Sequence, residues 1–278
     1  MVLSQKFRSD HVINSPSVVP YKVSDSIPST GAITPLPLST LAGDKVTFIG
    51  IGGGRGAGKA YTCRNVIDKV RERGYAALAD SIIHLKLDDF HCELPHSDRA
   101  LMADGKTRIN FDHPESFDFD LLAQVLGKLR QGEPVDVPVW DCATRKRTGA
   151  RHIEAKPKVV LVEGILVLYS RAVRQFLDMQ VFVDVDSDTR LGRQVRQVLE
   201  GAGEEEARDH TILNQFLDSY LYLAKPSFEE FILPTKRWAD VIVPRGDINH
   251  VAIELIAQRL IELGHDAAGD GAGRLSAN

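Results

Sequence analysis

Short apolar runs alternate with longer segments of helical periodicity over most of the chain. The short runs have the length of β-strands, and the longer segments repeat apolar residues at spacings of three and four. Because such alternation is typical of parallel sheets covered on both faces, the sequence predicts an α/β fold. We expect strands at Val46–Ile51, Ile82–Leu87, Val137–Trp140, Lys158–Val162, Gln180–Val185 and Asp240–Val243. We expect helices at Ala60–Arg73, Phe119–Gln131, Arg171–Leu177, Thr189–Leu199, Thr211–Leu223 and Val251–Leu263.

The two ends of the chain lack this alternation. Residues 1–44 are rich in Ser, Pro and Thr, which predicts an extended or disordered extension, although the apolar stretch 18–23 is compatible with one strand. Residues 265–278 are rich in Gly, Ala and Asp and are expected to be a disordered tail. One domain is therefore expected over residues 45–264.

Composition and charge narrow the class of protein. A net charge of −4 with 43% hydrophobic and 26% charged residues is ordinary for a globular enzyme and provides no basic field for nucleic acid. Three widely spaced cysteines argue against a disulfide framework or a zinc site and fit a reducing compartment. No apolar run has the length of a membrane span, and because the first fifteen residues lack a continuous apolar run we expect no secretory signal. We therefore expect a cytoplasmic protein without a membrane partner.

A glycine-rich loop follows the first predicted strand. The segment from Gly53 to Lys59 has the spacing G-x-x-x-x-G-K, and a helical pattern follows it. This arrangement binds phosphate, because backbone N–H groups and the helix N-terminus surround phosphate oxygens while the lysine adds a positive charge. The alternative is a simple turn with a solvated lysine. Glycine recurs at positions 52, 53, 54, 56 and 58, where each weakens regular structure, and this favours phosphate binding.

Acidic residues follow two other predicted strands. Asp88 and Asp89 come at the end of Ile82–Leu87, and Glu163 follows Lys158–Val162. In an extended chain neighbouring side chains point to opposite faces, so only one aspartate is expected to reach a substrate hydroxyl as general base. Glu163 is expected to bind Mg²⁺ directly or through water. The alternatives are a helix cap or solvated turn for the aspartates and a structural role for the glutamate.

Three arginines lie on the predicted helix Thr189–Leu199. Arg190, Arg193 and Arg196 are spaced by three residues and are expected to lie near one face, where they could bind phosphate. The helix lacks a clear apolar stripe, which favours a mobile lid over a core element. The alternative is an ordinary solvated helix, since acidic residues follow it.

Taken together, these motifs resemble the uridine kinase and phosphoribulokinase family of P-loop kinases, and most of all the uridine–cytidine kinases. The resemblance runs from about residue 45 to residue 263 and includes many ordered segments, which makes it far more specific than the glycine loop alone. The segments are Asn110–Asp118, Pro138–Asp141, Val162–Leu166, Phe182–Leu191, Lys225–Phe231, Pro234–Lys236 and Ala239–Gly246.

The resemblance implies a role for particular residues, with ATP and Mg²⁺ as cofactors. It implies that Asp88 activates the acceptor hydroxyl, that Lys59 binds ATP phosphates and that Arg193 acts from a lid. It also implies that Glu163 binds Mg²⁺ and that Asp112 holds ribose hydroxyls. The expected ATP contacts are Gly53, Gly54, Arg55, Gly56, Ala57, Gly58, Lys59, Ala60, Tyr61, Arg196 and Arg245. The expected substrate contacts are Asp88, Asp112, Trp140, Arg145 and Gln194.

Some positions depart from the family pattern. Ala60 stands where a Ser or Thr hydroxyl would bind Mg²⁺, and Thr62 points elsewhere on the helix, which predicts weakened metal binding with water as a substitute. Arg145 replaces the histidine expected to read a pyrimidine, and Gln194 replaces a lid arginine. Residues 201–208 also depart from the usual lid. These changes predict that the enzyme prefers a nucleoside with a different base, which could be a purine, or that it phosphorylates a different hydroxyl.

The sequence therefore predicts a P-loop NTPase fold with a five-stranded parallel sheet flanked by helices, a lid and a β excursion near residues 134–153. The predicted function is ATP-dependent phosphorylation of a ribonucleoside hydroxyl by a homo-oligomer, either a dimer or a tetramer. The alternative is a nucleotide-binding paralogue with a regulatory role and little or no activity. Retention of the proposed site acids and Lys59 argues against that alternative. The basic run 145–147 is interpreted as a solvated hairpin rather than a nucleic-acid site.

Overall fold

The computed structural model of the chain describes residues 46–93, 109–154, 157–202, 211–246 and 249–266. The predicted extension 1–44 lies outside these residues, as does nearly all of the predicted tail. Residues 203–210 also lie outside them, and they include most of the segment that departs from the family lid.

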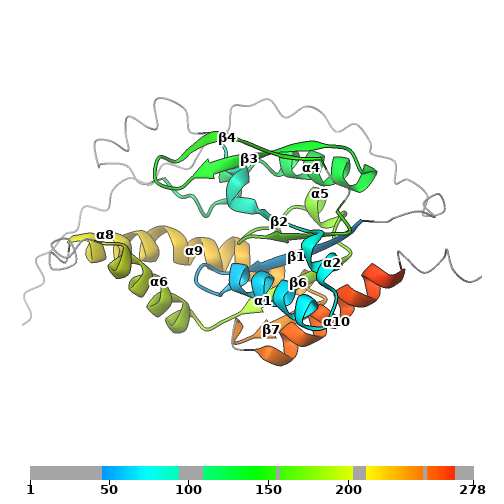
Figure 1. Cartoon of the computed structure of the whole chain (residues 1–278). Helices are drawn as coiled ribbons and strands as arrows, with labels where there is room; N and C mark the ends of the chain where they lie inside the picture. Colours follow the sequence, from blue (N-terminus) through cyan, green and yellow to red (C-terminus); the bar gives the residue numbers. More distant parts are fainter. Residues whose placement is uncertain (1–45, 94–108, 155–156, 203–210, 247–248, 267–278) are drawn as a thin grey trace, which may run out of the picture.

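Five parallel strands form the central sheet in the order β2-β5-β1-β6-β7 (Figure 1). This confirms the predicted sheet, and the boundaries differ from the expected ones by one or two residues. All four neighbouring pairs run parallel, so the carboxyl ends of the strands share one edge. The strands are β1 (Thr47–Gly53), β2 (Ile82–Lys86), β5 (Val159–Glu163), β6 (Met179–Asp184) and β7 (Val241–Pro244).

Both faces of the sheet are buried because its central strands carry apolar residues at nearly every position. On β1, Phe48 belongs to one hydrophobic core, while Ile49 and Ile51 belong to the other. Val160 and Leu161 of β5 divide in the same way, as period-two alternation requires. Helices cover each face, with α4 and α5 against the first core and α1, α2 and α10 against the second (Figure 1).

Local sequence explains where the helices begin and end. Asp118 accepts a hydrogen bond from the backbone N–H of Leu121 (2.9 Å) at the start of α4, and Gly132, with φ 72°, ends that helix. Helix α5 is shorter than predicted, because the N–H groups of Phe176 and Leu177 bond three residues back and tighten the turn. The helices are α1 (Lys59–Glu72), α2 (Ala76–Asp80), α4 (Phe119–Gln131), α5 (Arg171–Arg174), α6 (Ser187–Gly201), α8 (Thr211–Ser219), α9 (Lys225–Ser227) and α10 (His250–Asp266).

A separate antiparallel hairpin, β3 (Val135–Asp141) and β4 (Lys146–Ile153), forms the predicted β excursion. It lies over the carboxyl end of β2 together with the 3₁₀ turn Leu87–Phe90 (Figure 1). The backbone N–H of Trp140 donates to Asp89 Oδ1 (3.3 Å) and ties the hairpin to this turn.

A continuous helical run from residue 211 to residue 238 completes the domain. It contains α8, a π-helical turn Tyr220–Ala224, α9, a second π-helical turn Phe228–Ile232 and a 3₁₀ turn Leu233–Trp238. Helices α6 and α8 form an arm that projects from the body of the domain (Figure 1). Among the described residues, no helix has both the length and the apolar character needed to cross a bilayer.

Candidate active site

The sheet brings three sequence motifs to one edge. The glycine loop begins at the end of β1, Asp88 lies just beyond β2, and Glu163 is the last residue of β5. Glu163 is in register with Ile51 on one side and with Lys86 on the other, so the loop and Asp88 flank it. Open α/β folds bind ligands at this edge of the sheet.

The backbone of the loop requires glycine at two positions in particular. Gly56 has φ 75°, and a Cβ atom there would lie 2.6 Å from the backbone oxygen of Arg190. Gly58 caps α1 with φ 92°, in the left-handed region that other residues avoid. Lys59 begins α1, and its Nζ donates to the backbone oxygen of Gly54 (3.1 Å), so its ammonium lies across the loop.

Lys59, Asp88 and Glu163 line one cavity of about 170 Å³ beside the loop. Burial lowers the pKa of Lys59, and the charges of Glu163 and Asp88 partly offset that effect. Burial likewise raises the pKa of Glu163, against the opposing charge of Lys59. These three groups share their small space with the guanidinium of Arg55, and this mixture of cations and carboxylates suits a phosphate group with a divalent metal ion.

Glu163 also approaches a histidine on the neighbouring strand. His84 Nε2 lies 3.9 Å from Glu163 Oε1, and this buried nitrogen has no hydrogen-bond partner among the described residues. Burial, followed by the charges of nearby Lys86, Arg151 and Arg64, lowers the pKa of His84 to about 4. The histidine is therefore neutral at pH 7, and the contact is not an ion pair.

The donor set around the loop fits Mg²⁺ with fewer protein ligands than usual. Ala60 is exposed and contributes no oxygen, while the hydroxyl of Thr62 is buried and donates to the backbone oxygen of Gly58 (3.1 Å). The described residues contain no cluster of three or more His, Cys, Asp or Glu side chains suited to a metal ion. Mg²⁺ commonly takes one or two carboxylates and keeps several waters, so the carboxylate of Glu163 is compatible with such a site.

A second cavity of about 400 Å³ adjoins the first and shares Arg55, Gln194 and Gln197 with it. Asp112 lines this larger cavity, and its Oδ1 accepts a hydrogen bond from Arg55 Nε (2.6 Å). Arg145 lies in the hairpin turn with φ 53°, and its guanidinium is 4.7 Å from the centre of the Phe111 ring. The aromatic side chains that line the cavity are Phe111, Phe216 and Tyr220.

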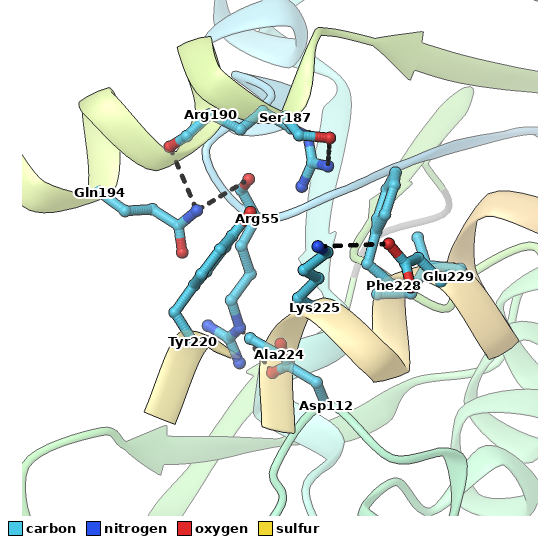
Figure 2. Close-up of a pocket in the computed structure, with 11 residues that line it drawn as sticks. Arg55, Asp112, Ser187, Arg190, Gln194, Tyr220, Ala224, Lys225, Phe228 and Glu229 are labelled. Atoms are coloured by element: carbon cyan, nitrogen blue, oxygen red, sulfur yellow. Dashed lines mark hydrogen bonds and ion pairs between the residues drawn. The ribbon is translucent and has the colours of Figure 1, made fainter. Parts of the chain in front are cut away.

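Gln194 connects helix α6 to the loop. Its Nε2 donates to the backbone oxygen of Arg55 (3.4 Å) and to that of Arg190 (3.1 Å). Figure 2 shows these two contacts, with the side chain of Arg55 extending toward Asp112 and Tyr220 beside it. The glutamine thus holds the loop backbone at the point where the two cavities meet.

The structure corrects the expected geometry of the paired aspartates. Asp88 and Asp89 lie in a 3₁₀ turn rather than in an extended strand. Asp89 has a structural role, because its carboxylate accepts a hydrogen bond from the backbone N–H of Trp140. Asp88 instead lines the smaller cavity. Trp140 itself packs against His91, with ring centroids 5.1 Å apart, and lines neither cavity.

The three arginines of α6 lie in different surroundings. Arg190 is buried, donates from Nε to the backbone oxygen of Val185 (3.0 Å) and stacks 3.8 Å from the centre of the Phe228 ring. Arg193 Nη1 reaches the loop, where it donates to the backbone oxygen of Gly56 (3.2 Å). Arg196 is exposed and lines neither cavity.

Two other expected ATP contacts lie beside the loop rather than in a cavity. Tyr61 is exposed on α1. Arg245 is exposed at φ 64°, and its backbone N–H donates to the oxygen of Asp184 (2.8 Å). The next residue, Gly246, packs on the loop, because a Cβ atom there would lie 2.4 Å from the oxygen of Ala57.

The structure also adds site residues that the sequence reasoning did not select. Phe111 lines the larger cavity, and its position directly before Asp112 was an available signal. Tyr220 lines it from a π-helical turn, and Gln197 lines both cavities from α6. Neither position carries a local sequence signal, since each depends on how α6 and the π-helical turn pack against the loop.

The chain is also similar to known proteins. The sequence model of the Phosphoribulokinase / Uridine kinase family matches residues 48–252. Uridine-cytidine kinase 2-B of Danio rerio is 38% identical over 216 residues, which cover 78% of this chain and 79% of that protein. A probable uridine-cytidine kinase of Caenorhabditis elegans is 37% identical over 217 residues, covering 77% and 83%. Phosphoribulokinase from Rhodobacter spheroides, at 12% identity and TM-score 0.52 over 72% of this chain and 70% of that one, shares the fold.

Proposed function

This chain belongs to the phosphoribulokinase and uridine kinase family and is a phosphotransferase with an alcohol acceptor, and we propose that it phosphorylates a ribonucleoside hydroxyl with ATP. One observation carries the proposal. Lys59, Asp88 and Glu163 line a cavity beside the glycine loop, and that cavity meets a larger one lined by Asp112. A donor phosphate and an acceptor hydroxyl can therefore be held side by side.

Each site residue has a task in this proposal. ATP, when bound, supplies the phosphoryl group and its leaving group, ADP. The acceptor oxygen forms a bond to the γ-phosphorus while the bond to the β,γ-bridging oxygen breaks, and that electron pair leaves with ADP. Asp88 takes the proton of the acceptor hydroxyl, because no described residue occupies its carboxylate by a hydrogen bond. Lys59 and Arg193 offset the charge of the phosphate oxygens.

Glu163 is the residue that would hold Mg²⁺, directly or through water. The metal neutralises phosphate charge when bound. We place water where the missing hydroxyl of residue 60 would bind, so this chain needs more Mg²⁺ than a relative with Ser or Thr at that position.

The acceptor cavity supports a preference that differs from that of a pyrimidine kinase. Asp112 is placed to accept hydrogen bonds from ribose hydroxyls. Arg145 lines the same cavity and donates hydrogen bonds without accepting any, so it favours a base with two neighbouring acceptors. The O6 and N7 atoms of a 6-oxopurine form such a pair. We therefore propose guanosine or inosine as preferred acceptors over adenosine.

We further propose that the protein is a homo-oligomer of the cytoplasm. Val251 and Leu255 on α10 are 71% and 63% exposed, and a second chain would cover them. The free thiols of all three cysteines fit a reducing compartment. Sedimentation velocity on the purified chain tests the assembly, and a monomer at micromolar concentration would contradict it.

The experiment that tests the function measures ADP release across a panel of nucleosides. We expect release that depends on a ribonucleoside and on Mg²⁺, with 6-oxopurines ahead of adenosine. Deoxynucleosides should react more slowly, because Asp112 then has fewer hydroxyls to bind. Nucleotide binding without nucleoside-dependent release for any acceptor would favour the alternative of a regulatory, inactive paralogue.

A further inference from the structure

Arg55 lies where the two cavities meet. It lines both of them, and it also lines the narrow cavity drawn in Figure 2, between Asp112 and the π-helical turn that carries Tyr220. Because Arg55 belongs to the glycine loop, its backbone is part of the phosphate site while its side chain extends to the acceptor side. This side chain therefore connects the two halves of the site.

The guanidinium uses only part of its hydrogen-bonding capacity. Nε donates to Asp112 Oδ1 at 2.6 Å, and within the described residues neither terminal amino group of Arg55 donates to any other atom. The Asp112 side chain is 7% exposed and that of Arg55 is 40% exposed. The Asp112 carboxylate is thus buried in the wall of the cavity. The two terminal amino groups of the Arg55 guanidinium remain available to a ligand in the open part of the cavity.

The surrounding charges place Arg55 near three ionised groups of the proposed reaction, Lys59, Asp88 and Asp112. Burial lowers its pKa, but the charges of Asp112 and Asp88, with the hydrogen bond to Asp112, outweigh burial and raise that pKa above its ordinary value. Arg55 and Lys59 line the same cavity, and the charge of Arg55 acts to lower the pKa of Lys59. The guanidinium is therefore charged, contacts Asp112 and lines the same cavity as Lys59 and Asp88.

The attachment of Arg55 to Asp112 also leaves room for the acceptor. A carboxylate has two oxygens, and Asp112 Oδ2 accepts no hydrogen bond from the described residues. An acceptor hydroxyl can bind Oδ2 while Arg55 keeps Oδ1. The same carboxylate would then orient the acceptor and the guanidinium together.

We propose that Arg55 is a catalytic residue of this chain, whose terminal amino groups contact the transferring phosphoryl group while its Nε is held by Asp112. The inference rests on the proposed kinase function. Arg55 forms and breaks no covalent bond, and it offsets the charge on the equatorial oxygens as the phosphorus passes from ADP to the acceptor oxygen. Binding of the acceptor at Asp112 would fix the guanidinium, which couples transfer to an occupied acceptor cavity.

The competing explanation is that Arg55 only neutralises Asp112 as a structural ion pair. The two explanations differ in which constant responds to mutation. A structural pair affects thermal stability and the KM for the acceptor, because it shapes the cavity. A residue that touches the phosphoryl group affects kcat when both substrates are saturating.

The test compares Arg55→Ala and Arg55→Lys with the parent chain, and uses Arg259→Ala as a matched control. Arg259 forms an exposed ion pair with Glu262 on α10, away from the site. We expect Arg55→Ala to lower kcat at least ~100-fold with little change in the KM for ATP, since arginines that stabilise phosphoryl transfer contribute factors of this size or more. Arg55→Lys keeps the positive charge but lacks the paired amino groups of the guanidinium, so its kcat should lie between those of the parent and Arg55→Ala. Added guanidinium ion should restore part of the activity of Arg55→Ala.

A second readout is independent of turnover. Calorimetry should show tight binding of ADP with aluminium fluoride and acceptor by the parent, and markedly weaker binding by Arg55→Ala, while ADP alone binds both equally. Melting curves show whether each variant is folded. If Arg55→Ala is unfolded, the kcat and the binding affinity of Arg55→Lys are compared with those of the parent instead. An unchanged kcat together with unchanged affinity for this complex overturns the inference. If the parent itself forms no product with any acceptor, it is the proposed function that fails.

Discussion

The side chain at position 60 determines how tightly the loop can hold a metal ion. Ala60 is exposed at the start of α1, so a larger residue fits there without displacing the core. Ala60→Thr should lower the Mg²⁺ concentration for half-maximal activity by roughly 5- to 10-fold, because one added ligand contributes about 1–1.4 kcal/mol. The rate of ADP release, measured as a function of Mg²⁺ concentration, gives this half-maximal concentration for the variant and the parent.

The matched control for that change is Ala60→Val, which has the shape of threonine without its hydroxyl. It should leave the Mg²⁺ dependence of the parent unchanged. A threonine variant that is no faster than the parent at limiting Mg²⁺ would contradict the account of the missing ligand.

Glu163 illustrates a conflict between stability and function. Burial raises its pKa in the folded protein, so the folded state binds a proton at pH values where the unfolded state has already lost it. The free energy of unfolding therefore falls as pH rises from the ordinary glutamate pKa of about 4.3 through the raised value. Glu163→Gln removes this penalty and should increase the free energy of unfolding by roughly 0.5–2 kcal/mol at pH 8 while abolishing activity.

Urea denaturation at pH 8 and at pH 4 measures the effect of Glu163→Gln. The difference between variant and parent should shrink toward pH 4, where the parent carboxyl is mostly protonated in both states. A variant that is less stable than the parent at pH 8 would show that the ionised carboxylate stabilises the fold.

At the scale of elements, helix α6 is anchored at its first turn. Arg190 is buried there, and its guanidinium binds the oxygen of Val185 and stacks on Phe228 of the facing helical run. A Cβ atom on Gly54 would lie 2.5 Å from Arg190 Nη1, so the arginine also packs directly on the glycine loop. The anchor joins three elements that carry the site.

Removing this anchor should loosen the arm and the loop together. Arg190→Ala forfeits a buried cation–π contact and charged hydrogen bonds, worth about 3 kcal/mol in total. The melting temperature should fall by roughly 6–12 °C in a domain of this size. Thermal denaturation followed by circular dichroism measures the change, and exposed Glu200→Ala on the same helix serves as control. A fall no larger than that of the control would mean that Arg190 does not anchor α6.

At the scale of the whole molecule, local patterns and long-range packing contribute different information. The five strands and α4 follow from apolar runs and capping residues, so the sequence sufficed to predict the sheet and the loop. The burial of Arg190 and the 3₁₀ turn Leu87–Phe90 depend on contacts with distant segments, which local patterns do not encode. The bond between Arg55 and Asp112 joins residues 57 positions apart and was missed for the same reason.

The central claim is that the chain transfers a phosphoryl group from ATP to a nucleoside. The most direct measurement is ³¹P NMR of the product formed from ATP, Mg²⁺ and each nucleoside, with Asp88→Asn as the inactive control. The account predicts one phosphate monoester resonance coupled to the sugar protons, equimolar with ADP and absent with the control. Inorganic phosphate as the only product for every nucleoside, or no product at all, would contradict it.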